Sequence, residues 1–103
     1  MNYVIIKAVK INKNNALQIF PELTKESDYI HIYRDASGVC WDIQQKCLNA
    51  REPERWNHWN IYKQIQYAVK SEYGDSLIIN SDTVFDNIPN ELKKKIQQES
   101  SNV

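Results

Sequence analysis

Residues 28–45, with the sequence DYIHIYRDASGVCWDIQQ, are the part of the chain from which the fold is best predicted. Apolar and polar residues alternate over 28–34 and again over 39–45, which is the two-residue period of a strand with one buried face. The residues between them, DASG at 35–38, are typical of a turn, and the glycine allows a positive φ angle. We therefore predict a β-hairpin over residues 28–45.

The register of this hairpin is predicted from the requirement that one face stays apolar, because a slip by one residue would mix the two faces. The turn sets Ile32 opposite Trp41 and His31 opposite Asp42. The expected apolar face consists of Ile30, Ile32, Trp41 and Ile43. The expected polar face consists of Tyr29, His31, Tyr33, Cys40, Asp42 and Gln44.

The segment before the hairpin predicts one clear strand and one ambiguous element. Residues 3–11 are an unbroken run rich in β-branched residues and apolar on both faces at first, so we expect a strand in the centre of a sheet. Residues 16–23 fit either a strand that ends at Pro21 or a short helix. Because a proline damages the interior of a helix, either element must be short.

The segment after the hairpin predicts two helices and a short strand. Pro53 opens a long helix and Gly74 ends it. Residues 76–80 are a short buried strand, residues 81–88 are a connection of uncertain form, and Pro89 opens the last helix. The inward face of the first helix is expected to carry His58, Ile61, Tyr62, Ile65, Ala68, Val69 and Glu72. The inward stripe of the last helix is Ile88, Leu92 and Ile96.

These elements predict a single α+β domain over residues 1–99, followed by a frayed tail at 100–103. We expect a mainly antiparallel sheet of four to five strands, with a long central helix and a C-terminal helix on one face. Length and composition agree, since 103 residues, 42% of them apolar, suffice for one core.

Composition also excludes several classes of function. The chain has 13 basic and 13 acidic side chains, and this balance argues against nucleic-acid binding. Two glycines are too few for a glycine-rich phosphate loop, and no apolar run is long enough for a membrane helix. Lys7 interrupts the N-terminus too early for a signal peptide, so we expect a cytoplasmic protein whose Cys40 and Cys47 are free thiols. No metal or cofactor motif is present.

Three residues are candidates for chemistry. The cross-strand pair His31–Asp42 could act as a general base, because a carboxylate beside an imidazole fixes its tautomer and raises its pKa. A polar strand face is the plainer interpretation, and no nucleophile accompanies the pair. His58 could be a ligand or an acid/base residue in a cleft, although a buried histidine with one hydrogen-bond partner is more common. We therefore assign no catalytic residue.

Aromatic residues supply the candidate binding surface. Trp59 lies at the boundary of the inward face of the first helix, and Trp56 lies beyond it beside Arg55. Exposed tryptophan with arginine is typical of protein-contact surfaces, so we expect a homodimer or a protein partner there. The alternative is that the loop before Pro53 covers both indoles. Tyr29 and Tyr33 on the open strand face are further candidate contacts.

The sequence resembles the small single-domain α+β proteins of bacterial accessory genes, namely integron-cassette proteins and toxin-immunity proteins. The resemblance rests on YRDASGVCWD at 33–42, followed by Arg55-Trp56, Ile61-Tyr62 and Glu72-Tyr73-Gly74. It implies a partner-binding, non-catalytic role, often with self-association. A small-ligand-binding domain with an aromatic cleft, and a small enzyme using His31–Asp42 or His58, are the alternatives.

Overall fold

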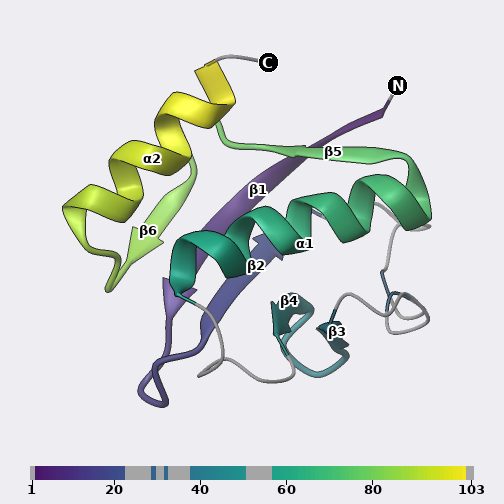
Figure 1. Cartoon of the computed structure of the whole chain (residues 1–103), viewed down its shortest axis with the longest axis horizontal. Coiled ribbons are helices and arrows are strands. Elements are labelled where there is room, and N and C mark those ends of the chain that lie inside the picture. Colours follow the sequence, from purple (N-terminus) through teal and green to yellow (C-terminus); the bar gives the residue numbers. More distant parts are fainter. Residues whose placement is uncertain (1, 23–28, 30–31, 33–37, 51–56, 102–103) are drawn as a thin grey trace.

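The protein is a two-layer α+β domain, in which two helices cover one face of a mixed sheet (Figure 1). The computed structural model describes residues 2–22, 29, 32, 38–50 and 57–101. The strands are β1 (Asn2–Ile11), β2 (Leu17–Pro21), β3 (Val39–Asp42), β4 (Cys47–Ala50), β5 (Asp75–Ile78) and β6 (Val84–Asp86). The helices are α1 (His58–Tyr73) and α2 (Asn90–Ser101). The predicted fold class is confirmed.

The sheet has the strand order β3-β4-β2-β1-β5, and β6 also pairs with β1. The pairs β1–β2, β2–β4 and β3–β4 are antiparallel, whereas β5 and β6 both run parallel to β1. The sheet is therefore larger and more mixed than expected. Residues 17–21 are a strand that ends at Pro21, which settles the ambiguous segment. The connection at 81–88 contains the unexpected strand β6.

Strand β1 is the central strand, as predicted, and an irregularity divides it. Its register with β2 shifts after Ile6, where an extra residue is inserted. Val4 and Ile6 before the shift and Val9 and Ile11 after it all pack in or against the core. The inserted residue reverses the alternation of side chains along the strand, so that the apolar side chains on both sides of the irregularity face the helices. The Thr83 hydroxyl donates to the Ile6 carbonyl (2.6 Å) at this irregularity.

The predicted partner of the strand at 39–42 is wrong. β3 pairs with β4, and Trp41 lies opposite Leu48 rather than Ile32. The connecting turn spans 43–46: Asp42 Oδ1 accepts hydrogen bonds from the backbone amides of Gln44 and Gln45, both at 3.0 Å. Because this side chain satisfies two backbone donors locally, residues 43–45 turn instead of extending the strand. Ile43, expected on the apolar face, is 60% exposed.

Only Tyr29 and Ile32 of the predicted strand at 28–34 belong to the described residues, and they contradict it. The backbone amide of Ile32 donates to the carbonyl of Tyr29 (3.0 Å), which is the spacing of a turn. Both side chains are fully buried, although the alternation placed them on opposite faces. A turn brings residues three apart to the same side, which explains their common burial.

Helix α1 begins later than predicted. Asn57 is its N-cap, and the Asn57 side chain accepts a hydrogen bond from the Asn60 amide (2.8 Å). This bond satisfies an amide at the helix start, so His58 rather than Pro53 opens the helix. Gly74 ends the helix as predicted, with a φ angle of 71°. Five of the seven residues expected to face inward are buried, namely Ile61, Tyr62, Ile65, Ala68 and Val69.

Helix α2 completes the core from the same side of the sheet as α1. Leu92 and Ile96 are buried and Ile88 packs against them, which confirms the predicted stripe. The Lys93 ammonium group lies 5.2 Å from the centre of the Phe85 ring, which joins α2 to β6. The helix continues to Ser101, so the expected tail starts at a residue that is still helical.

Candidate interaction surface

The sequence-predicted contact residue Tyr29 lies inside the protein. Its ring makes edge contacts with Tyr73 (4.9 Å between centroids) and Trp41 (5.7 Å). Its hydroxyl donates to Asp75 Oδ2 (3.1 Å). Burial raises the pKa of Tyr29, and the neighbouring Asp75 carboxylate raises it further. Because no part of Tyr29 is exposed, this side chain cannot be the surface contact that the sequence suggested.

Of the predicted pair His31–Asp42, only Asp42 belongs to the described residues. Asp42 lies opposite Cys47 in the sheet, and its carboxylate is occupied by the turn at 43–46. His31 lies outside the described residues, as do Tyr33, Arg55 and Trp56. The predicted contacts at the last three residues therefore stay predictions.

His58 has one hydrogen-bond partner within the protein, which is the more common of the two roles predicted for it. It is half-buried at the start of α1, and its Nε2 lies 2.9 Å from the carbonyl oxygen of Asn15. Because a carbonyl only accepts, Nε2 carries a proton and donates it. This hydrogen bond ties α1 to the turn between β1 and β2, and it gives His58 a structural partner.

Trp59 is half-buried at the edge of the core, as its position on the helix predicted. Its indole stacks on the ring of Tyr62, with 5.7 Å between centroids and an interplanar angle of 12°. The Lys63 ammonium group lies 5.4 Å from the Trp59 ring, which is the distance of a cation–π contact. These contacts within the chain account for much of the indole surface.

Cys40 and Cys47 are not joined in a disulfide. Cys47 is fully buried, and its sulfur accepts a hydrogen bond from Gln18 Nε2 (3.7 Å). Burial raises the pKa of the Cys47 thiol to about 12, with smaller contributions from Asp42 and Cys40. A protonated, buried thiol is a poor nucleophile and a poor metal ligand. Within the described part of the chain, no group of three His, Cys, Asp or Glu side chains is placed to hold a metal ion.

The sheet has a second apolar surface on the side away from the helices. The core takes Val4, Ile6, Val9 and Ile11 from β1, so the residues between them point the other way. We call this second surface the open face. Its members are Tyr3, Ile5 and Lys10 of β1, Phe20 of β2, Ile78 of β5, and Val84 and Asp86 of β6, together with Ala8 and Gln18, which are buried among their neighbours.

Side chains on the open face form rows across the strands. Ile5 pairs with Ile78, and the next row places Ala8 between Phe20 and Val84. Tyr3 and Val84 are each 55% exposed, so two of the four large apolar residues that protrude from the described surface belong to this face. Such an apolar group on a sheet face is typical of a contact surface.

A polar row borders the apolar rows of the open face. Lys10 lies between Gln18 and Asp86 in the register, and its ammonium group sits 5.1 Å from the centre of the Phe20 ring. Lys10 and Asp86 therefore present opposite charges on neighbouring strands, beside the apolar surface.

The outer edge of the sheet at β5 is partly occupied by side chains of α1. Gln66 Nε2 donates to the backbone carbonyl of Leu77 (3.1 Å), and Lys70 Nζ donates to the Ser76 hydroxyl (3.0 Å). Because a main-chain acceptor at this edge already has a partner, addition of a further strand is disfavoured there. The face of the sheet is a better candidate surface than this edge.

Sequence reasoning missed the open face as a site, although one signal for it was present. The run at 3–6 is apolar without alternation, and from it we predict a strand in the centre of the sheet. The structure covers one side only with helices (Figure 1). The sequence pattern did not indicate that Val84 lies in a strand, because a three-residue strand is too short to show a period of alternation.

A mixed sheet with two helices on one face makes this chain a small α+β protein. It belongs to the integron cassette protein family Hfx_Cass5, whose sequence model matches residues 3–83. This match confirms the integron-cassette part of the resemblance. A solved structure of Integron Cassette Protein Hfx_Cass5, from the mobile metagenome of the North West Arm sewage outfall, is 28% identical over 98% of each chain, with a TM-score of 0.45.

The search of curated proteins found no match. No helix among the described residues has the length and apolar character needed to cross a membrane.

Proposed function

We propose that this chain is a non-catalytic protein-interaction domain that works by partner binding or self-association through the open face. The observation that carries this proposal is the apolar surface on the side of the sheet away from the helices. Tyr3 and Val84 protrude there, and Ile5, Phe20 and Ile78 are partly exposed on the same face. Burying such a surface against another protein removes apolar area from water, at about 25 cal/mol per Å².

The position of the polar row supports the same role. Protein interfaces combine an apolar centre with a polar rim, and Lys10 and Asp86 lie at the margin of the apolar rows. The charged residues give orientation, because a partner must present matching charges beside its apolar contacts. An immunity-type role, in which the partner is a toxin, would be one form of this activity.

A cytoplasmic location is part of the proposal. Its support is that Cys40 and Cys47 are not joined in a disulfide, since thiols persist in reducing compartments. Cell fractionation of a tagged chain tests the location independently of the binding experiment.

The interaction role is tested with two matched double variants. Tyr3→Ser with Val84→Lys alters the open face, and Tyr67→Ser with Ile43→Lys makes the same chemical changes at other exposed sites. Tyr67 is 63% exposed on α1 and Ile43 is 60% exposed in the turn at 43–46. Each purified variant is compared with the wild type by sedimentation, and as bait in a quantitative pull-down, after circular dichroism confirms folding.

We expect the open-face variant to lose its associated protein, or its self-association, at least tenfold relative to the control variant. If both variants associate like the wild type, the open face is not the interface. If the wild type has neither a self-associated form nor a partner that depends on the open face, the interaction role is wrong.

A further inference from the structure

The register of the open face makes its surface complementary to itself. Three residues of β1 on this face have a neighbour on β5 or β6 with a matching property, whereas the fourth, Tyr3, pairs with Ser76. Lys10 pairs with Asp86, which has the opposite charge. The small Ala8 pairs with the larger and exposed Val84, and Ile5 pairs with Ile78.

Resting on the interaction role proposed above, we propose that the occupant of the open face is a second copy of this chain. The twofold axis lies between the two sheets, parallel to β1, above the boundary between β1 and its parallel neighbours β5 and β6. A rotation about this axis exchanges the two sides of the boundary. Each residue therefore faces, on the second copy, the residue with which it pairs in its own sheet.

The contacts that result are favourable in the rows of Lys10, Ala8 and Ile5, whereas Tyr3 faces Ser76 of the second copy. Lys10 faces Asp86 of the second copy, and Asp86 faces Lys10 of the second copy, so two opposite-charge contacts form. Val84 faces the small side chain of Ala8 of the second copy. Ile5 and Ile78 bury one another's apolar surface.

The charged row selects this axis over the other orientation that twofold symmetry allows. An axis perpendicular to β1, placed to overlay the two apolar rows, would bring Lys10 toward the end of the sheet that carries the aromatic ring of Tyr3. The axis parallel to β1 keeps charged residues against charged residues.

The size of the contact sets the expected strength. Strand β1 has ten residues, so the contact is about 33 Å long at about 3.3 Å per residue. Two neighbouring strands, β1 and its parallel partner, at about 4.8 Å spacing make it about 10 Å wide. The resulting area, on the order of 300 Å² per copy, is well below the roughly 800 Å² of a standard interface. We therefore expect a reversible dimer with a dissociation constant in the micromolar range.

The chain itself does not oppose this association, because its formal net charge is zero. Two copies therefore approach with little long-range repulsion. The two layers face outward in the dimer, with helices on both outer surfaces and the two sheets in the middle. Sheets packed face to face in this way normally align within about 30° of one another, which the parallel axis permits.

The experiment reverses the charge of Lys10 or of Asp86 and measures the dimer dissociation constant by sedimentation equilibrium. Lys10→Glu alone places two carboxylates together in each intersubunit pair, and Asp86→Lys alone places two ammonium groups together. Each single variant should raise the dimer dissociation constant at least about tenfold. An equimolar mixture should form a heterodimer close to wild-type strength, because both of its intersubunit pairs again have opposite charges.

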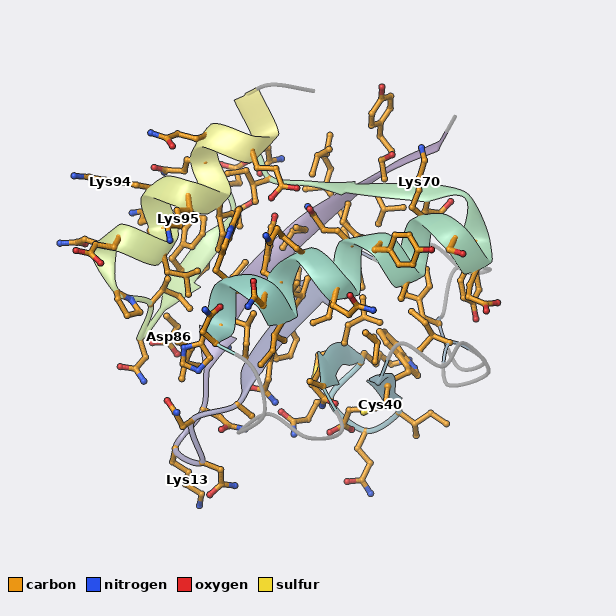
Figure 2. All side chains as sticks on the ribbon, viewed as in Figure 1. Lys13, Cys40, Lys70, Asp86, Lys94 and Lys95 are labelled. Atoms are coloured by element: carbon orange, nitrogen blue, oxygen red, sulfur yellow. The ribbon has the colours of Figure 1, made fainter. Side chains whose placement is uncertain are left out.

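The mixture separates an intersubunit contact from an effect inside one chain. Mixing leaves the neighbours within each chain unchanged, so it cannot repair a loss of folding. Lys94→Glu is the matched control, since it makes the same change in net charge on α2, where the side chain points away from the molecule (Figure 2). It should leave the dissociation constant unchanged.

Two outcomes overturn the inference in different ways. If the wild type is a monomer up to high micromolar concentration but still binds a different protein through the open face, the second copy is the wrong occupant and the interaction role stands. If the wild type dimerises but the mixture associates no better than either variant alone, the proposed axis is wrong. If the wild type is a monomer and binds no other protein through the open face, both proposals are wrong.

Discussion

The hydroxyl of Tyr29 donates a hydrogen bond of 3.1 Å to the carboxylate of Asp75, which lies 46 residues further along the chain. Both residues are buried, and the bond joins the segment before β3 to the first residue of β5. Tyr29→Phe should lower the free energy of unfolding by about 1–3 kcal/mol, because it leaves the Asp75 carboxylate inside the protein with one donor fewer. Urea unfolding followed by tryptophan fluorescence measures this change.

Tyr67→Phe is the control for this prediction. Tyr67 is 63% exposed, so loss of its hydroxyl should change the free energy of unfolding by less than about 0.5 kcal/mol. Equal effects of the two substitutions would mean that the Tyr29–Asp75 bond adds nothing to stability.

The buried thiol of Cys47 predicts a loss of stability at alkaline pH. Burial raises the pKa of Cys47 to about 12, whereas the thiol of the unfolded chain has its ordinary pKa of about 8.5. Above that ordinary value the unfolded chain releases the proton while the folded chain keeps it. The contribution of the protonated Cys47 thiol to the free energy of unfolding is therefore lost progressively as the pH rises from about 8.5 toward 12.

Cys47→Ala tests this pH dependence. The variant should be less stable overall, because it removes a buried side chain, but its free energy of unfolding should fall less steeply between pH 8 and pH 10. Parallel curves for the variant and the wild type would show that Cys47 does not titrate differently in the folded and unfolded chain.

Asn57→Ala should lower the free energy of unfolding by about 1 kcal/mol. The Asn57 side chain accepts the hydrogen bond of the Asn60 amide at the start of α1, and alanine cannot replace that acceptor. Asn57→Ser keeps an acceptor and should recover most of the loss. If alanine and serine have the same effect, the helix does not depend on this cap.

Glu99 predicts a substitution that stabilises the protein at neutral pH. Burial raises the pKa of the Glu99 carboxyl, although nearby Lys63 lowers it in part. Its Oε2 atom is buried and has no hydrogen-bond partner in the described part of the chain. A raised pKa means that stability is highest at acid pH, where the carboxyl is protonated, and falls as the pH rises through the raised value.

Glu99→Gln should therefore raise the melting temperature at pH 7, and the gain should disappear below about pH 4, where both forms are neutral. Glu91→Gln is the matched control. Glu91 is exposed in the first turn of α2, where a negative charge is favourable, so its loss should lower the melting temperature slightly. A lower melting temperature for Glu99→Gln at pH 7 would contradict the prediction.

Several elements could be predicted from the sequence because their signals are local. The inward stripe of α1, its end at Gly74 and the stripe that includes Leu92 and Ile96 all follow from side-chain spacing along one helix. The central position of β1 follows from its apolar run at 3–6. In each case the residues that carry the signal are close in the chain, and the backbone geometry of one element decides which side chains share a face.

The candidate surface could be predicted only in part. The sequence indicated a protein-contact surface, but it placed this surface at Arg55, Trp56 and Trp59 and on the strand face with Tyr29. Trp59 packs against Tyr62, and Tyr29 is buried. Val84 gained its place only because β6 pairs with β1, a contact between residues more than seventy positions apart.

By itself, the sequence determined the α+β class, the two helices and the apolar character of β1 on both faces. Only the tertiary structure decided that β3 pairs with β4, that β5 and β6 follow one another along the same side of β1, and which face of β1 the helices cover. The physical reason is that periodicity states which side chains point the same way within one strand. It does not state which other strand supplies the hydrogen bonds at its edge, because that choice depends on packing between distant segments.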